Sequence, residues 1–344
     1  MVLSGAISDE KLFESEVRTG GNDFPYFVRL GRMFDYATAK KLAERALQHA
    51  NLTALQALAQ LQPVATSEVV STADGVRIIS RATRHGQASG PQLFFLLRHQ
   101  LRGQYRRIFR ELARSTIIRS AIRISGQGLR PEIVTQVPFY PGLDEFDLEA
   151  TLEDTLNKGD LATYADIVGV ERIAQRKIGT IILDTSGSIS GSKLLAAATA
   201  AAVAAYHLRH DKYAFVAFNT LASTIKGMNQ PANIDHIVDT ILDTEPAGYT
   251  NIADGLQRGY EQYRRAGRRE SWAILITDGI ANRGGDPEPH ARRFHSLHVL
   301  QTPGTYAQGD ETCQRLARLG GGRHIKVQDH TTVPRALIHL LYRS

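Results

Sequence analysis

Short apolar runs alternate with helical patterns over the C-terminal half of the chain. The runs are rich in β-branched residues and bounded by polar ones, as buried strands are. We expect strands at Thr180–Leu183, Tyr213–Phe218, Trp272–Thr277, Ser296–Leu300 and His324–Val327. We expect helices at Lys193–Leu208, Ile234–Leu242, Ile252–Arg265, Pro287–Phe294, Thr312–Leu319 and Thr332–Tyr342. This alternation predicts an α/β fold with a doubly wound, mostly parallel sheet and helices on both faces.

The N-terminal part has a different pattern and predicts a mainly helical region. Helix formers dominate Phe34–Leu47 and Leu52–Leu61, and Pro63 ends the second helix. The stretch Val69–Ser80 has β-branched residues on both sides of an Asp-Gly pair, which predicts a short hairpin. A long helical pattern then runs from Pro91 to about Ile124.

One face of this long helical pattern is basic. Arginine recurs at every fourth position, at Arg98, Arg102, Arg106, Arg110 and Arg114. Such a stripe suits nucleic-acid phosphate or an acidic protein surface. The aromatic residues lie on the opposite, apolar face and resemble core residues more than base-stacking platforms. An intramolecular role is therefore favoured, and a nucleic-acid-binding regulator that uses the stripe is the alternative.

Charge divides the chain into three parts. The net charge is +6, yet residues 131–175 hold 10 acidic and 2 basic residues, while residues 1–130 hold 19 basic and 10 acidic ones. The acidic stretch includes a helical pattern that aligns Leu148, Leu152 and Leu156, and it is the expected partner of the arginine stripe. We predict a helical N-terminal region over 1–128, an acidic linker and helix over 129–175, and an α/β domain over 176–344.

Composition indicates a cytoplasmic globular protein. The hydrophobic content of 42% is ordinary, and the single Cys313 leaves no intramolecular disulfide. The longest apolar run, Leu194–Tyr206, is shorter than the ~20 residues of a membrane span. The first residues lack the basic and apolar regions of a secretory signal. We therefore expect a cytoplasmic location and no membrane span.

Candidate metal ligands follow two of the predicted strands. The strand Thr180–Leu183 ends in Asp184, Ser186 and Ser188 on a glycine-containing turn, and Asp278 directly follows another strand. A carboxylate and hydroxyls on a tight turn suit a hard cation such as Mg²⁺, Mn²⁺ or Ca²⁺. Because ligands of parallel sheets bind at the carboxyl ends of strands, both segments are expected at one site.

These segments resemble a known metal site. Asp184-x-Ser186-x-Ser188, Thr250 in a Gly-Tyr-Thr-Asn loop and Asp278 before a glycine resemble the metal-ion-dependent adhesion site (MIDAS) of the von Willebrand factor type A (VWA) family. The resemblance covers roughly the last half of the chain and implies a Rossmann-like fold. It implies that the serines and the threonine contact Mg²⁺ directly and that the aspartates act mostly through water. A partner's Glu or Asp then fills the open coordination position.

Cytoplasmic VWA proteins with an N-terminal extension often work with MoxR-type AAA+ ATPases, as in CoxE-like or magnesium-chelatase-like systems. This chain is similar to that group, also in its segment Asp286–Ala291. The resemblance thus implies a protein–protein interaction module, an adaptor for such an ATPase in protein remodelling or metal-cofactor assembly. The oligomeric state stays open.

Catalytic motifs fit the same loop poorly. A phosphate-binding loop needs a spacing that Gly187–Lys193 lacks, and a nucleophile elbow would place serine where the chain has Ile189. No general base is evident beside the motif. We therefore expect no enzymatic activity. A metal-dependent hydrolase is the remaining alternative, because bound magnesium can activate water.

Overall fold

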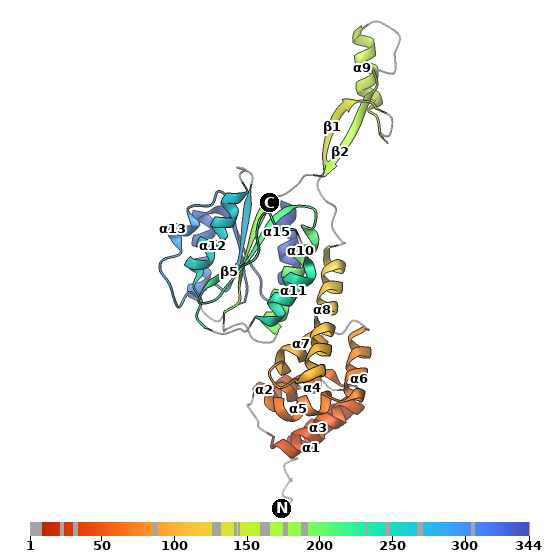
Figure 1. The fold of residues 1–344 in the computed structure, drawn as a ribbon, viewed down its shortest axis with the longest axis vertical. Helices are drawn as coiled ribbons and strands as arrows, with labels where there is room; N and C mark the ends of the chain where they lie inside the picture. The colour runs from red at the N-terminus through yellow and green to blue at the C-terminus, as the bar shows by residue number, and fades with distance from the viewer. Residues whose placement is uncertain are drawn as a thin grey trace, which may run out of the picture.

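The computed structural model in Figure 1 shows three parts: a helical N-terminal region, a projecting arm and an α/β domain. It describes residues 9–343 except for 21–23, 30–33, 85–88, 126–131, 141–142, 144, 159–165, 175–177, 187–191, 232, 245–247, 267–270 and 304–306. No helix among the described residues is long and apolar enough to cross a membrane. The boundaries 1–128, 129–175 and 176–344 stay a prediction.

The N-terminal region is helical, as expected. Its helices are α1 (Asp9–Thr19), α2 (Phe24–Arg29), α3 (Tyr36–Gln48), α4 (Leu52–Leu61), α5 (Pro63–Val70), α6 (Ala73–Arg84), α7 (Ser89–Leu97) and α8 (Gly103–Ser125). Phe13 of α1 packs against Phe24 and Phe27 of α2, with ring centroids 5.0 and 5.1 Å apart. Apolar side chains of these helices form one continuous core with apolar side chains on one face of the sheet of the α/β domain.

The predicted hairpin at Val69–Ser80 is wrong, because α5 and α6 occupy this stretch. Thr72 accepts a hydrogen bond at its hydroxyl from the amide of Gly75 at 3.0 Å, as an N-cap residue does. Asp74 lies in the first turn of α6 and pairs with Arg77 one turn later. The Asp-Gly pair therefore begins a helix, whose β-branched residues, such as the fully buried Ile79, face the core.

The predicted long helix is interrupted. It divides into α7 and α8, and the chain between them turns at Arg98–Arg102. Gly103 begins α8 with a φ of 56°, a conformation that favours glycine. The break places Arg98 at a corner between the two helices, so the five arginines do not form one continuous stripe.

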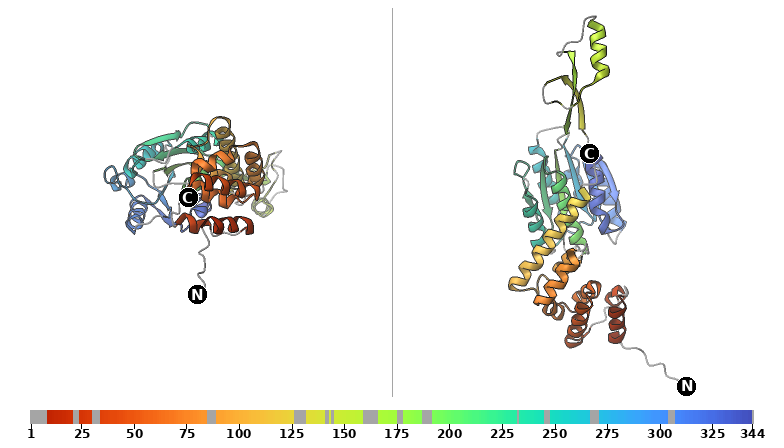
Figure 2. Two further views of the ribbon diagram at one scale, coloured as in Figure 1. Left: turned by 90° about the horizontal axis from the view of Figure 1, so that it is seen from below. Right: turned by 90° about the vertical axis from the view of Figure 1, so that its right-hand side faces the viewer.

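A projecting arm occupies most of the predicted acidic linker. Strands β1 (Glu132–Pro138) and β2 (Val168–Ala174) form an antiparallel pair, with Glu132 opposite Ala174 and Pro138 opposite Val168. The predicted helix is α9 (Leu148–Lys158), which lies at the far end of the hairpin. Figures 1 and 2 show the arm extending away from both the helices and the large sheet. The hairpin itself was not predicted.

The C-terminal half confirms the predicted α/β class. Its sheet has the order β5-β4-β3-β6-β7-β8, in which only β5 is antiparallel to its neighbour. The strands are β3 (Ile178–Asp184), β4 (Lys212–Phe218), β5 (Ala222–Lys226), β6 (Trp272–Thr277), β7 (Leu297–Gln301) and β8 (Gly321–Lys326). The helices are α10 (Ser192–His207), α11 (Ile234–Asp243), α12 (Ile252–Arg265), α13 (Glu288–Ala291), α14 (Ala307–Leu319) and α15 (Val333–Arg343), with the 3₁₀ turn η2 (His330–Thr332) before α15. The edge strand β5 was not predicted.

Successive residues of the central strand β3 point to opposite faces of the sheet. Ile181 and Leu183 join the core that includes α10, α11, α15 and the N-terminal helices. Ile182 joins the second core, below α12 and α14. Both faces are therefore covered, which explains why the buried strands read as continuous apolar runs.

Candidate metal centre

Asp184 is a buried carboxylate at the carboxyl end of the central strand. It is 3% exposed. Its Oδ2 accepts a hydrogen bond from the hydroxyl of Thr277 at 2.7 Å, and its Oδ1 accepts one from the amide of Ser186 at 3.0 Å. Burial raises the pKa of Asp184 to about 6, although these hydrogen bonds favour the ionised form. A cation beside this carboxylate would offset the unfavourable burial of its charge.

Two further predicted residues lie at the same edge. Ser186 is 1% exposed and also hydrogen-bonds Asp184 through its side chain. Asp278 follows β6, which pairs with β3 in parallel so that Leu183 lies beside Ile276. The two aspartates therefore end neighbouring strands, and the charge of Asp278 adds to the raised pKa of Asp184. Ser188 lies outside the described residues.

The turn after Asp278 is fixed by close backbone packing. Gly279 has a φ of 83°, and a Cβ there would lie 2.4 Å from the carbonyl oxygen of Gly309. The Oδ1 atom of Asp278 accepts a hydrogen bond from the amide of Ile280 at 3.0 Å. The Thr-Asp-Gly sequence thus makes a turn that holds the carboxylate at the sheet edge and packs tightly against α14.

Thr250 is attached to this turn, although no predicted strand immediately precedes it. Its amide donates to Oδ1 of Asn282 at 2.6 Å, and its carbonyl oxygen accepts from the amides of Asn282 and Arg283, both at 3.2 Å. Thr250 is 4% exposed, and its hydroxyl has no hydrogen-bond partner among the described residues. The structure therefore fastens the Thr250 loop to the Asp278 loop and leaves an oxygen donor available.

Asp254 has a structural role in this region. Its Oδ2 accepts a hydrogen bond from the amide of Ala222 at 2.6 Å, so it holds the start of β5. Its amide in turn donates to the side chain of Asn251, which caps α12. This agrees with leaving Asp254 out of the candidate metal ligands.

Some supporting residues were missed by the sequence analysis. Thr277 and Asn282 position Asp184 and Thr250 through the hydrogen bonds described above. Only the adjacency of Thr277 to Asp278 hinted at its role, since a strand-end hydroxyl can reach the neighbouring strand. No sequence signal pointed to Asn282, because its contact with Thr250 joins two loops 32 residues apart.

The helical region contacts the segment that leads to Thr250. Arg98 is 5% exposed and donates to the carbonyl oxygens of Thr244 at 2.8 Å and Leu242 at 3.4 Å. These carbonyls lie at the C-terminal end of α11, where a cation is favourable. Arg98 therefore connects the α7–α8 corner to the C-terminal end of α11, six residues before Thr250 in the sequence.

Two more arginines of the predicted stripe bind α11. Arg110 makes two hydrogen bonds to Asp243, at 3.0 and 2.6 Å, and Arg114 makes one to Asp239 at 3.1 Å. The intramolecular interpretation is thus confirmed for these arginines and Arg98. The prediction that the acidic stretch 129–175 pairs with these arginines is wrong for Arg110 and Arg114, whose carboxylate partners lie on α11. The carboxylates of α11 recur at every fourth residue and therefore face α8 as a matching row.

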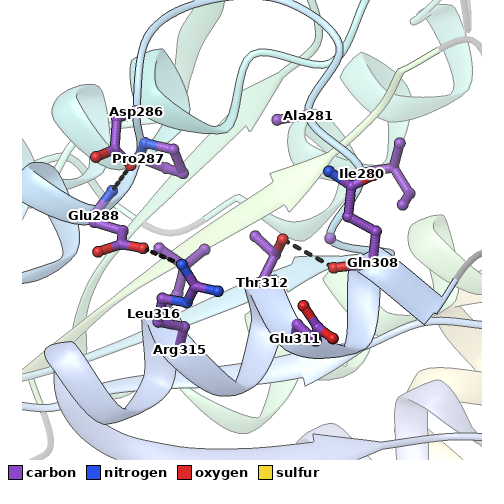
Figure 3. A pocket seen from close by; sticks show the side chains of 11 residues that line it. Ile280, Ala281, Asp286, Pro287, Glu288, Gln308, Glu311, Thr312, Arg315 and Leu316 are labelled. Carbon is purple, nitrogen blue, oxygen red and sulfur yellow. Dashed lines mark hydrogen bonds and ion pairs between the residues drawn. The ribbon is translucent and has the colours of Figure 1, made fainter.

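A pocket of about 300 Å³ lies beside the Asp278 turn, between the loop after β6 and α14. Figure 3 shows Ile280, Ala281 and Asp286 on the loop, and Glu288, the first residue of α13, facing Arg315 of α14. Arg315 pairs with Glu288 at 3.0 Å. The surface next to the candidate site is therefore concave and lined by both carboxylates and a guanidinium.

The donor chemistry fits a divalent cation. Asp184, Ser186, Thr250 and Asp278 supply only oxygen, which hard cations such as Mg²⁺ prefer. Among the described residues, no group of three or more His, Cys, Asp or Glu side chains is placed to hold a metal ion. A site here would therefore rely on hydroxyls in addition to two carboxylates, which leaves a divalent cation room for further ligands.

Comparison with known sequences identifies the domain that carries these residues. Residues 180–332 match the sequence model of the von Willebrand factor type A domain. Together with the mostly parallel six-stranded sheet, the match shows that this part of the chain is a VWA domain. Such domains typically act in protein interactions.

The relatives found by sequence are distant. Inter-alpha-trypsin inhibitor heavy chain H3 of Mesocricetus auratus is 28% identical over 178 residues, covering 43% of this chain and 20% of that protein. The Homo sapiens protein of the same name gives the same identity and coverage. The chain thus spans about a fifth of the length of these relatives.

Solved structures are similar over about half of the chain. A von Willebrand factor type A protein from Catenulispora acidiphila is 16% identical with a TM-score of 0.42, covering 51% of this chain and 44% of that one. Proximal thread matrix protein 1 from the mussel byssus, with a zinc-occupied MIDAS motif, is 16% identical with a TM-score of 0.40, covering 48% and 47%.

Proposed function

We propose that this chain is a non-enzymatic, divalent-metal-dependent protein–protein interaction module of the cytoplasm. The observation that carries the proposal is that two carboxylates lie at the carboxyl ends of neighbouring strands at one edge of the VWA sheet. Asp184 and Asp278 end neighbouring strands, and Thr250 is hydrogen-bonded to the Asp278 loop. The proposed metal ligands are Asp184, Ser186, Ser188, Thr250 and Asp278. Mg²⁺ is the proposed ion, and Mn²⁺ or Ca²⁺ would suit the same donors.

The bound ion would supply a positive charge with a free coordination position at the surface. Asp184, ordered by Thr277 and Ser186, would hold this charge at the sheet edge. Thr250 would offer its hydroxyl from a loop that Asn282 fixes. We propose that a Glu or Asp of the protein partner completes the coordination, because two carboxylates only neutralise the ion and do not fill its shell.

The surroundings support an acidic ligand from the partner. Tyr249, beside Thr250, is 53% exposed, and the guanidinium of Arg283 lies 5.4 Å from its ring centroid. An exposed aromatic ring with an adjacent arginine favours a protein contact, since both residue types are enriched at interfaces. Arg283 would attract an incoming carboxylate toward the ion.

For the partner we propose a MoxR-type AAA+ ATPase, for which this chain would act as an adaptor in protein remodelling or metal-cofactor assembly. This part of the proposal rests on the resemblance to CoxE-like proteins. The test is binding of the purified chain to the MoxR-type ATPase encoded in the same genome, in Mg²⁺ and in EDTA. We expect binding in Mg²⁺ only, and its loss in Thr250→Ala.

Thr240→Ala is the matched control for this experiment. Thr240 lies on α11 away from the proposed ligands, and its hydroxyl donates to the carbonyl oxygen of His236 within the helix. This variant should bind the ATPase as the wild type does. Equal binding in Mg²⁺ and EDTA would contradict the metal-dependent mode, and absence of binding in both would contradict the proposed partner.

A further inference from the structure

The helix at the tip of the arm has an unusual distribution of side chains. Leu148, Leu152 and Leu156 share one face of α9 and are 60%, 52% and 79% exposed. The face toward the hairpin carries Thr151 instead, whose hydroxyl accepts a hydrogen bond from the amide of Val168 at 3.0 Å. An amphipathic helix normally turns its leucines toward the core. Here the leucines point to solvent, which marks a surface for binding.

Acidic side chains flank this leucine face. Glu149, Glu153 and Asp154 are exposed on α9, and the stretch 131–175 has a net charge of −8 in a chain of +6. The rest of the chain therefore carries +14. A surface that receives α9 should combine an apolar floor with a basic rim.

The same chain contains such a surface. A groove of about 210 Å³ lies between α7, α8, α10 and the start of α15. Its lining includes the apolar side chains of Pro91, Ile117, Ile124, Leu195 and Pro334. Since a cavity of about 150 Å³ accommodates benzene, this groove has room for a leucine side chain.

Arginines lie on the helices that line this groove. The guanidinium of Arg119 lies 3.4 Å from the hydroxyl of Thr116, which lines the groove. Arg123 and Arg335 are exposed and adjoin the lining residues Ile124 and Pro334 in sequence. The helices that line the groove thus carry positive charge that complements the acidic flanks of α9.

The arm holds α9 away from the groove of its own chain. Each strand of the hairpin has seven residues, which span about 23 Å. The arm follows α8 in sequence and extends away from α8 and α10 in Figure 1 and in the right-hand view of Figure 2. The groove of a second copy of the chain can therefore reach α9, whereas the groove of the chain that carries α9 does not.

We propose that the chain self-associates by inserting the leucine face of α9 into the α7–α8–α10 groove of a second copy. Two arms exchanged about a two-fold axis make the same contact twice, which doubles the buried area. Each contact is one helix on one groove, so the dimer is a weak one that forms at micromolar concentrations. This contact uses neither the metal ligands nor the ATPase, so it is independent of the proposed function.

Sedimentation velocity of the full chain tests this proposal over about 1–100 µM, where small interfaces associate. We expect a concentration-dependent dimer in both Mg²⁺ and EDTA. The double variant Leu152→Asp/Leu156→Asp should raise the dissociation constant at least about tenfold, and it should fold normally because both side chains are exposed. Leu221→Asp, at a site that is 74% exposed near β5, is the matched control and should dimerise as the wild type does.

Charge reversal identifies the two surfaces. Glu149→Arg/Glu153→Arg should weaken the dimer, Arg119→Glu/Arg123→Glu should weaken it as well, and an equimolar mixture of the two variants should associate again. Absence of a dimer up to about 100 µM, or a dimer that the leucine variants leave unchanged, would overturn the proposal.

Engineered cysteines distinguish exchange between copies from docking within one chain. The native Cys313 is buried and does not compete. Chains with Leu152→Cys mixed with chains with Ser120→Cys should give a disulfide-linked dimer on oxidation. A chain that carries both substitutions and closes only an internal disulfide as a monomer would show docking in cis and overturn the exchange.

Discussion

Replacement of Arg98 by Met tests the connection between the helical region and the VWA domain. The substitution keeps the apolar stem and removes the guanidinium that caps α11 at Thr244 and Leu242. A hydrogen bond from a charged group contributes about 1.5–3 kcal/mol, and the side chain is only 5% exposed, so water would replace it poorly. Relief of the buried charge offsets part of this loss. We expect a destabilisation of about 2 kcal/mol.

Urea unfolding followed by circular dichroism measures this change. Hydrogen exchange at the amides of Ile241–Thr244 measures the second expectation, which is faster exchange, because the C-terminal end of α11 loses the guanidinium that caps it. Arg102→Met is the control, since Arg102 is exposed on the same corner, and it should change stability by less than about 0.5 kcal/mol. Wild-type stability together with unchanged exchange in Arg98→Met would refute the coupling.

Two further outcomes follow from the packing and the charges around the site. Burial raises the pKa of Asp184 from 3.8 to about 6, so the folded metal-free protein binds more protons than the unfolded chain between these values. The contribution of Asp184 to the free energy of unfolding is therefore present below pH 4, and about 3 kcal/mol of it is lost as the pH rises through 6. Urea unfolding in EDTA at several pH values should show this trend in the difference between the free energies of unfolding of the wild type and of Asp184→Asn. Gly259→Ala should destabilise by about 1–3 kcal/mol in the same assay, because its Cβ would lie 2.3 Å from Cδ1 of Ile182, whereas Gly285→Ala meets no atom within 4 Å and should be nearly neutral.

The VWA sheet was largely predictable because its central strands are buried on both faces. Runs such as Ile181–Leu183 have no polar interruption, and the polar residues that follow them mark the strand ends. The candidate ligands Asp184 and Asp278 were found for the same reason. Their placement at one edge follows directly from parallel strands. Ser188 lies outside the described residues, so its role stays a prediction.

Other features depend on contacts that local sequence does not encode. The sequence around Asp74 is compatible with both a turn and a helix. The N-cap hydrogen bond of Thr72 and the burial of Ile79 stabilise the helix. The strands of the arm pair over long sequence separations, with Pro138 opposite Val168. The partner of Arg110 was misassigned because the charge pattern alone does not say which acidic helix lies beside α8.

Isothermal titration of Mg²⁺ into the purified metal-free chain tests the central claim most directly. The proposed site predicts one bound ion per chain, with binding abolished in Asp184→Asn and strongly weakened in Thr250→Ala, while Thr240→Ala binds as the wild type does. Absence of Mg²⁺, Mn²⁺ and Ca²⁺ binding, or an affinity that is the same in Thr250→Ala and wild type, would contradict it.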